Sequence, residues 1–339
     1  MHKRNEMSIP YKHIGDYQPV DIRELRPKGS YKTLMEKRTY FLKIVGDENF
    51  KIKPAFLKYR PCPVCHANDY KYMFKKDSLE IVECNKCEMI YVNPILKSSA
   101  LEKIYKHEDY SEIMKKLQGE SHQYRKYRFG EERVDAIKKF RDDKLGLKKW
   151  LDIGCSTGFV LEVAKEEGWD VIGIELNPYA VQFARKKGIE VIEKNYSKIQ
   201  FGESVFSEIT IFDVLEHLEK PKDILEKAFR ELVQFGGIYI YVPNWNSASR
   251  ILMGNDAHFI WPSHHLNYFT PFTIVKLVEN IGFKVIHVET EGLDIFDYMW
   301  FLQEKEKPVS CLEEIADKVQ FFINAGFYGK NLRIYAKKS

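Results

Sequence analysis

The stretch Asp152-Ile-Gly-Cys-Ser-Thr-Gly158 stands between a short apolar run, 150–153, and a helical pattern at 159–167. Glycine adopts positive φ without steric cost and lets the backbone approach a ligand closely. A carboxylate, Glu175, ends the next strand-like run, 17 residues after Gly158. In an open α/β sheet, ligands bind outside the carboxyl ends of the strands, where an acid on the second strand accepts hydrogen bonds from ribose hydroxyls. The stretch therefore predicts a nucleoside site at a strand-to-helix turn.

Strand and helix patterns alternate on the C-terminal side of this turn. Short apolar runs predict strands at 170–175, 189–192, 208–212, 238–242, 283–288 and 332–336. Helices are expected between them, at 178–187, 221–233, 271–281 and within 295–325. The stretch 244–269 is rich in aromatic residues and histidines, and we expect an irregular insertion there. The alternation predicts an α/β fold with a Rossmann-like, doubly wound, mostly parallel seven-stranded sheet.

Other readings of the glycine turn must be weighed against the same residues. The GxGxxG fingerprint of dinucleotide sites is not met, because Ser156 stands where a glycine would be needed. No GxxxxGK[ST] phosphate loop occurs in the chain. A tight turn that binds no cofactor stays open, since a glycine turn alone is weak evidence.

Five segments follow one another in order within residues 120–339. They are Asp152-Ile-Gly-Cys-Ser-Thr-Gly158, Gly173-Ile-Glu-Leu-Asn-Pro178, Phe212-Asp-Val-Leu-Glu-His-Leu-Glu-Lys-Pro221, Gly236-Gly237 and His265-Leu-Asn-Tyr-Phe-Thr-Pro271. Together they resemble the motifs of the class I S-adenosylmethionine-dependent methyltransferases. The closest resemblance is to the branch that includes ubiquinone O-methyltransferases and many tailoring enzymes.

The resemblance implies roles for residues of the cofactor site. Glu175 would hold the ribose diol, and Phe212 would lie near the methionine ammonium through its backbone carbonyl. Leu176 and the stretch 195–196 would lie near adenine. Ser156 replaces the middle glycine of the first motif, so its torsions must permit the turn. The implied cofactor-binding set is Asp152, Gly154, Cys155, Gly158, Phe159, Glu175, Leu176, Asn195, Phe212 and Asp213.

Methyl transfer to an alcohol or phenol needs a group that accepts the hydroxyl proton, and histidine is a good base near neutral pH. The candidates in the loops on the cofactor side of the sheet are His217, His265 and Tyr268, with His258 and His264 as further histidines. A structural role stays open for each of them. The aromatic residues Trp245, Phe259 and Trp261 would either wall the acceptor site or pack in the core.

Two CxxC pairs, Cys62-Pro-Val-Cys65 and Cys84-Asn-Lys-Cys87, are separated by 18 residues. This spacing is typical of a tetrahedral zinc site, and four protein thiolates leave no position for an activated water. We therefore expect a structural Zn²⁺ in a small β module. Many such modules have glycine after the second cysteine of each pair. His66 and Glu88 occupy those positions here, so both turns should be strained.

The predicted organisation has four parts: a basic extension at 1–60, a zinc-ribbon module at 61–95, a helical linker or lid at 96–145, and a methyltransferase domain at 146–339. Residues 1–60 hold 14 Lys/Arg against 7 Asp/Glu and therefore carry a charge of +7. Because the whole chain carries +4, the remaining residues carry −3. We expect a solvated extension that wraps the surface, although a basic arm could also meet an anionic partner. No apolar run of membrane-spanning length and no secretory signal is visible, so a cytoplasmic protein with reduced cysteines is expected.

The leading functional hypothesis is O-methylation of a sugar, a surface-glycan precursor or another small molecule. A zinc ribbon followed by a Tyr91-Val-Asn-Pro94 stretch resembles an architecture that includes sugar C-methyltransferases. Those enzymes usually carry a further C-terminal domain, which we do not expect here because the chain ends soon after its last predicted strand. They also tend to have a Tyr at the position of Pro262, and both departures weaken the hypothesis of C-methylation. A third class is a methyltransferase or binder of RNA or protein. We do not expect a nucleic-acid partner, because residues 61–95 form no obvious stacking platform. The acceptor and the oligomeric state stay open.

Overall fold

The structure is a computed structural model, which describes residues 14–25, 36–105, 107, 112, 115, 119–142 and 144–339. Much of the predicted basic extension, at 1–13 and 26–35, lies outside the described residues, as does most of 106–118 in the predicted linker. Within the described residues, none of the helices has the length and apolar character needed to cross a lipid bilayer.

A seven-stranded sheet forms the centre of the molecule. Its strands lie in the order β12 (Phe283–Glu291), β13 (Asn331–Lys338), β10 (Leu232–Pro243), β9 (Phe206–Phe212), β6 (Lys149–Ile153), β7 (Asp170–Ile174) and β8 (Glu190–Ile192). β13 runs antiparallel to both neighbours, β10 and β12, whereas the pairs among β10, β9, β6, β7 and β8 are parallel. The predicted Rossmann-like, mostly parallel seven-stranded sheet is confirmed.

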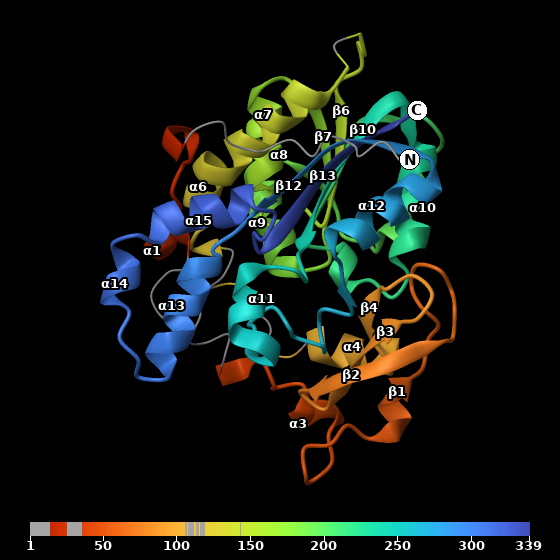
Figure 1. Cartoon of the computed structure of the whole chain (residues 1–339). Coiled ribbons are helices and arrows are strands. Elements are labelled where there is room, and N and C mark those ends of the chain that lie inside the picture. Colours follow the sequence, from red (N-terminus) through yellow and green to blue (C-terminus); the bar gives the residue numbers. More distant parts are fainter. Residues whose placement is uncertain are drawn as a thin grey trace, which may run out of the picture.

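Helices cover both faces of this sheet (Figure 1). One face packs against α7 (Glu131–Phe140), α8 (Phe159–Glu166) and α9 (Pro178–Lys186), and the other against α10 (Pro221–Glu231) and α12 (Pro271–Ile281). The remaining helices are α1 (Ile22–Leu25), α3 (Leu42–Val45), α4 (Ser98–Tyr105), α6 (His122–Arg125), α11 (Ala248–Met253), α13 (Asp294–Glu304), α14 (Ser310–Glu313) and α15 (Ala316–Ala325). A π-helical turn, η4 (Lys126–Gly130), joins α6 to α7, and the short 3₁₀ turns are η1 (Ile14–Asp16), η2 (Pro54–Phe56), η5 (Tyr196–Lys198), η6 (Leu215–His217) and η7 (Gly254–Asp256).

Local chemistry explains where these helices begin and end. Asn177 caps α9 by accepting the backbone N–H of Ala180, and Thr270 forms a capping box at the start of α12. Gly282 ends α12 in the left-handed conformation. The helix expected to reach residue 233 ends at Glu231, because Leu232 already pairs with Phe206 in the sheet.

The last two strands are joined by more helix than expected. The stretch 294–325 holds α13, α14 and α15 in place of the single helix anticipated from the sequence. These three helices form a cap, which buried polar side chains connect to its surroundings. Asp294 accepts the backbone N–H of Ser249 at 2.9 Å and a side-chain N–H of Gln320 at 3.2 Å. The cap is thereby attached to α11, which lies in the stretch expected to be irregular.

The cysteine pairs belong to a second, smaller sheet in the lower part of Figure 1. Its strands lie in the order β11 (Asn267–Tyr268), β4 (Ile90–Val92), β3 (Leu79–Cys84) and β2 (Tyr70–Lys76), with β1 (Leu57–Lys58) pairing separately with β5 (Ile95–Leu96). β11 comes from the insertion after β10, about 180 residues beyond β4 in the chain, and it pairs with β4 antiparallel. The small sheet is therefore built from two distant parts of the chain.

Candidate functional site

The turn after β6 has the backbone geometry that its glycines suggested. The φ angles of Gly154, Ser156 and Gly158 are +82°, +53° and +79°. A side chain at Gly154 would also collide with Val214, since its Cβ would lie 2.3 Å from Val214 Cγ2. Ser156 therefore accepts a left-handed conformation that costs a non-glycine residue energy, and the turn keeps its shape without the middle glycine.

Glu175 faces this turn from the end of β7. Its Oε2 accepts the backbone N–H of Ser156 at 3.0 Å, and its Oε1 accepts those of Leu176 and Asn177 at 2.6 and 2.8 Å. Burial raises the pKa of this carboxyl, while the three amide hydrogen bonds lower it. A carboxylate offers about four acceptor positions, so capacity for one ribose hydroxyl remains. Glu175 can therefore accept one of the two hydroxyls of the ribose diol that the resemblance assigns to it.

Three of the residues implied for the cofactor lie beneath the turn and not on its surface. Asp152 is 2% exposed and its Oδ1 accepts the hydroxyl of Thr210 at 2.7 Å. Burial raises the pKa of Asp152 to about 7. Cys155 and Phe159 are buried among the hydrophobic residues between the sheet and α8. Their side chains support the turn from within the core.

The stretch proposed near adenine divides into an exposed and a buried part. Leu176 is 60% exposed, and Asn195 caps η5 by accepting the backbone N–H of Ser197. Tyr196 instead turns into the core, where its hydroxyl donates to Glu231 at 2.6 Å. Leu176 and Asn195 thus remain candidates for the adenine side, whereas the Tyr196 side chain does not.

The sequence patterns did not single out Arg133, which lies on α7. Its guanidinium lies 4.4 Å from the ring centre of Phe212, 4.8 Å from that of Tyr241 and 5.4 Å from that of Phe159. It is 7% exposed, and no hydrogen bond or ion pair to it occurs among the described residues. In the sequence, the one indication of this role was an arginine beside Val134 on the buried face of an amphipathic helix. A forked guanidinium without a protein carboxylate suits a carboxylate of a ligand.

A cavity of about 340 Å³ adjoins Arg133 and the end of β9. It is lined by charged residues, histidines and aromatic residues, which are Arg125, Arg133, Lys330, Asp213, Glu216, Glu291, His217, His258, His265, Phe129, Tyr241, Phe259 and Trp261. Asp213 follows β9 with a φ of +54°. Desolvation by the surrounding protein raises its pKa, and the nearby charges of Arg133, Arg125 and Lys330 act in the opposite direction. This cavity is the centre of the candidate active site.

Two imidazoles meet at one wall of the cavity. Nδ1 of His217 lies 2.9 Å from the carbonyl oxygen of His264, and Nδ1 of His265 lies 2.7 Å from that of Phe259. A carbonyl oxygen only accepts hydrogen bonds, so Nδ1 carries the proton in both rings and Nε2 carries a lone pair. The ring centres are 4.8 Å apart. Burial lowers the pKa of both histidines, which keeps them neutral and able to accept a proton.

Glu216 lies beside these histidines and is 1% exposed. Neither carboxyl oxygen has a hydrogen-bond partner among the described residues, and Oε1 is 3.8 Å from Nε2 of His217. Burial and the neighbouring Asp213 hold its pKa well above the usual range. Ligand atoms of Glu216, His217 and His265 lie within 4.8 Å of one another, so the trio could also hold a divalent cation.

The other aromatic and histidine candidates divide between cavity and core. His258, Phe259 and Trp261 line the cavity. Tyr268 is 1% exposed, packs against Trp245 and Phe259 in the core, and does not line the cavity. His264 stacks on Trp261 at 3.9 Å and likewise does not line the cavity. This placement argues against Tyr268 and His264 as proton acceptors, and Trp245 packs in the core.

Part of the N-terminal extension also contributes to the cavity. Val20 and Leu25 line it and are each 8% exposed. The segment is attached to the helices before the sheet, because the Asp21 backbone N–H donates to the Tyr124 hydroxyl at 2.7 Å and Arg128 donates to the Gln18 carbonyl at 2.7 Å. Through Val20 and Leu25, the described residues 17–25 therefore form part of the cavity wall. The charge pattern of the extension did not reveal this role.

The four cysteines come together as their spacing predicted. Sγ of Cys62 lies 3.5 Å from that of Cys87, and Sγ of Cys65 lies 3.5 Å from that of Cys84. Zn–S bonds of about 2.3 Å in a tetrahedron place sulfur atoms about 3.8 Å apart, so the cluster fits a zinc ion. The two turns match each other: His66 and Glu88, with φ of +58° and +61°, donate their backbone N–H groups to Cys62 and Cys84.

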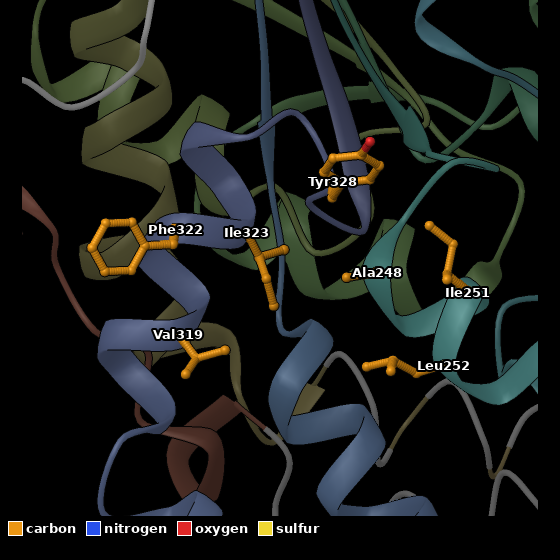
Figure 2. Close-up of a pocket in the computed structure, with 7 residues that line it drawn as sticks. All are labelled: Ala248, Ile251, Leu252, Val319, Phe322, Ile323 and Tyr328. Carbon is orange, nitrogen blue, oxygen red and sulfur yellow. The ribbon is translucent and has the colours of Figure 1, made fainter.

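A second hollow lies between α11 and α15, outside the active-site cavity. Figure 2 shows its lining, which takes Ala248, Ile251 and Leu252 from α11 and Val319, Phe322 and Ile323 from α15, together with Tyr328. The lining offers no carboxylate, imidazole or thiol. It is an apolar surface groove and not a site of proton transfer.

Comparisons with known proteins agree with this geometry. Residues 122–288 match the family model of a methyltransferase domain. The ubiquinone biosynthesis O-methyltransferase of Pseudomonas aeruginosa is 27% identical over 128 residues, which are 35% of this chain and 55% of that protein. The enzyme of the same name from Aeromonas salmonicida is 27% identical over 152 residues, covering 41% of this chain and 63% of its own length. The chain thus spans less than two thirds of the curated relatives it matches.

Among solved structures, an S-adenosylmethionine-dependent methyltransferase from Archaeoglobus fulgidus is 24% identical with a TM-score of 0.47, covering 68% of this chain and 100% of that chain. A possible histamine N-methyltransferase from Thermotoga maritima is 16% identical with a TM-score of 0.43, covering 64% and 91%. The family match contains the glycine turn, Glu175, Arg133, His217 and His265. Residues 122–288 of this chain therefore belong to the methyltransferase-domain family.

Proposed function

We propose that the chain is an S-adenosylmethionine-dependent methyltransferase that methylates a hydroxyl oxygen of a small molecule. The observation that carries the proposal is the pair His217 and His265. Backbone carbonyls accept the Nδ1–H of both rings, so each Nε2 keeps its lone pair, and both histidines line the same cavity as Arg133 and Asp213.

The residues around the turn suit the chemical groups of the cofactor. Glu175 offers an acceptor to the ribose, and the guanidinium of Arg133 offers a fork to the methionine carboxylate. Asp213 is the nearby anion for the ammonium group. When bound, the cofactor supplies an activated sulfonium methyl group, and the protein's task is to align an oxygen with it and exclude water.

The histidines supply the proton acceptor. An alcohol or phenol becomes a competent nucleophile as its proton moves to Nε2 of His265 or His217. Nδ1–H of His265 donates to the Phe259 carbonyl and that of His217 to the His264 carbonyl, so an imidazolium on either ring is stabilised by one fixed carbonyl dipole. Glu216 stands next to His217, but because its raised pKa favours the neutral carboxyl, the carbonyl dipoles and not Glu216 carry this stabilisation.

The cavity favours a polar acceptor. Lys330, Asp213 and Glu291 offer donors and acceptors for hydroxyl groups, while Trp261 and Phe259 offer apolar faces. This combination suits a sugar or a surface-glycan precursor, and it also admits a phenol. The P. aeruginosa and A. salmonicida relatives are named for O-methylation in ubiquinone biosynthesis, which supports methylation of an oxygen in a small molecule.

The alternatives predict different properties. Sugar C-methylation remains the second candidate, because two cavity histidines would also serve proton removal from carbon. An RNA- or protein-binding role for the cysteine module receives less support. The sheet of the module includes β11, which comes from the insertion beside the cavity, so the module is not separate from the methyltransferase domain. We propose that the four cysteines hold a structural zinc ion.

Calorimetry with S-adenosylmethionine tests the cofactor. We expect binding by the wild type and weakened binding by Glu175→Ala. No binding by the wild type, with Glu175→Ala making no difference, would reject the enzyme. Incubation with a ¹³C-methyl cofactor and a panel of sugars, nucleotide sugars and phenols then tests the acceptor. The carbon shift of the transferred methyl group distinguishes an O-methyl from a C-methyl product, and steeply salt-dependent RNA binding without transfer would favour the third class.

A further inference from the structure

Arg60 stands two residues before Cys62 and is 6% exposed. Its guanidinium makes four hydrogen bonds to neutral oxygen atoms. Nε donates to the carbonyl of Val92 at 3.3 Å, and Nη1 donates to that of Glu219 at 2.9 Å. Nη2 donates to the carbonyl of Leu266 at 2.7 Å and to the side chain of Asn267 at 3.0 Å. A buried arginine held mainly by backbone carbonyls fixes the places of several chain segments at once.

Two of these carbonyls, those of Glu219 and Leu266, belong to the loops that carry His217 and His265. Leu266 directly follows His265, and Glu219 lies two residues after His217. One guanidinium therefore binds both loops at the point where each leaves its histidine. The cavity itself does not include Arg60.

Asn267 continues the same connection. Its Oδ1 accepts from Arg60, and its Nδ2 donates to the carbonyls of Leu215 and Leu218, on either side of Glu216 and His217. In addition, the backbone N–H of Leu266 donates to the Glu216 carbonyl at 2.6 Å. The relative position of the histidine rings thus depends on bonds made directly behind them.

The cysteine module holds the other end of this arrangement. Asn267 pairs with Tyr91 of β4, and the backbone N–H of Val92 donates to the Leu266 carbonyl at 2.9 Å. β4 is joined to β3 through the turn that contains Cys84 and Cys87. A metal that closes the cysteine cluster would clamp this turn to the Cys62–Cys65 turn, and Arg60 leads directly into the latter.

We propose that Arg60 is a positioning residue, through which the four-cysteine module sets the spacing of the His217 and His265 loops. The module acts on the reaction without touching the substrate, and metal occupancy determines whether the proton acceptors are in place. The inference rests on the proposed function only for its kinetic readout, since the geometry of the imidazoles can be measured separately.

The test compares Arg60→Lys with Lys58→Ala in the full chain. Lys at position 60 keeps the charge but cannot form the fork. Lys58 is the matched control, because it lies two residues before Arg60 and reaches Glu219 through a half-exposed side-chain ion pair of 2.7 Å. ¹⁵N spectra of the imidazoles, assigned with His217→Gln and His265→Gln, report the Nδ1–H bonds, while calorimetry reports cofactor binding.

For Arg60→Lys we expect shifted or broadened Nδ1–H signals of both histidines, a kcat lower by about 10²-fold, as misplacement by about 1 Å can cause, and unchanged cofactor affinity. Lys58→Ala should match the wild type. A lower melting temperature with wild-type imidazole signals and kcat would overturn the proposal, and so would equal effects of the two substitutions. If no acceptor is turned over, the imidazole signals alone decide.

Two further measurements apply if Arg60→Lys does not fold. Asn267→Ala removes the bonds to Leu215 and Leu218 and should displace the same imidazole signals. In the wild type, stepwise removal of zinc by a chelator should displace the His217 and His265 signals before the amide signals of Gly154 and Gly158. Simultaneous loss of all four signals would show that the module supports the whole fold and not the histidine loops, which would contradict the proposal.

Discussion

The two halves of the cleft are built in different ways. In the proposed site, the cofactor half comes mainly from one stretch of the chain, 152–213, to which α7 adds Arg133. The acceptor half brings together residues 20–25 and the ends of three strands, with Trp261 and His265 from the insertion and Arg60 behind them. A contiguous half is specified by local turn chemistry, whereas a dispersed half depends on every element that holds its parts together.

Cys84→Ser should separate the two halves most completely. Loss of one of four thiolates would remove the proposed structural zinc, whose binding supplies about 10–16 kcal/mol in small zinc-binding peptides, so we expect loss of the metal and of detectable methyl transfer. Cofactor binding should survive in part, because the turn and Glu175 lie outside the module. Metal analysis and calorimetry measure both effects.

Cys311→Ser is the control for that experiment, since Cys311 is exposed and does not belong to the cluster. It should retain metal, activity and stability. Equal loss of cofactor affinity and activity in Cys84→Ser would show that the halves are not separable.

Substitution of the cavity histidines should lower kcat strongly without affecting the cofactor half. For His265→Gln and His217→Gln we expect a decrease of about 10²–10⁴-fold, the usual contribution of a general base, at unchanged cofactor affinity. Steady-state kinetics and calorimetry provide the two numbers. His264→Gln is the comparison, because that ring does not line the cavity; if it lowers kcat as much as the other two, the assignment of the proton acceptor is wrong.

Glu175→Gln should have the complementary effect on the cofactor half. A hydrogen bond to a charged group contributes about 1.5–3 kcal/mol, so we expect the Kd for S-adenosylmethionine to rise about 10- to 100-fold while kcat at saturation changes little. Calorimetry measures the affinity. Asp170→Asn, at the opposite end of the same strand, should leave it unchanged. An effect on kcat larger than that on Kd would mean that Glu175 also positions the acceptor.

The pH dependence should show the smallest of these effects. Burial lowers the pKa of His217 and His265, and the neutral ring is the active form, so kcat should stay level as the pH falls to about 6.5, the ordinary value for histidine. Activity should decline only below that pH. Stability should decline in the same direction, because the unfolded chain takes up protons on these histidines before the folded one does. A kcat that already falls above pH 7 would contradict neutral imidazoles.

Much of the cofactor half and the cysteine cluster could be predicted from the sequence, because the patterns that indicate them are local. Glycines at 154 and 158, an acid at the end of the next strand and two CxxC pairs each restrict the backbone within a few residues. The strained turns at Ser156, His66 and Glu88 were anticipated for the same reason, and the structure has positive φ at all three.

The second half could not be predicted in the same way. His217, His264, His265 and Tyr268 are chemically plausible bases in sequence, and only packing decides that two of the four face the cavity. Arg133 gave a weak signal, since an arginine on a helix face is usually solvated. The role of residues 17–25 was hidden because Val20 and Leu25 lie within 1–60, whose overall basic charge predicted a solvated extension.

The sequence by itself determined the sheet, the cofactor turn and the cysteine cluster, since periodicity, glycine torsions and ligand spacing act over short distances along the chain. Tertiary structure alone decided which side chains share the acceptor cavity and what holds them there. Arg60 and Leu266 are 206 residues apart, yet they are joined by one hydrogen bond of 2.7 Å. Such a contact exists only after the chain has folded, because no local preference encodes which distant segments come to lie side by side.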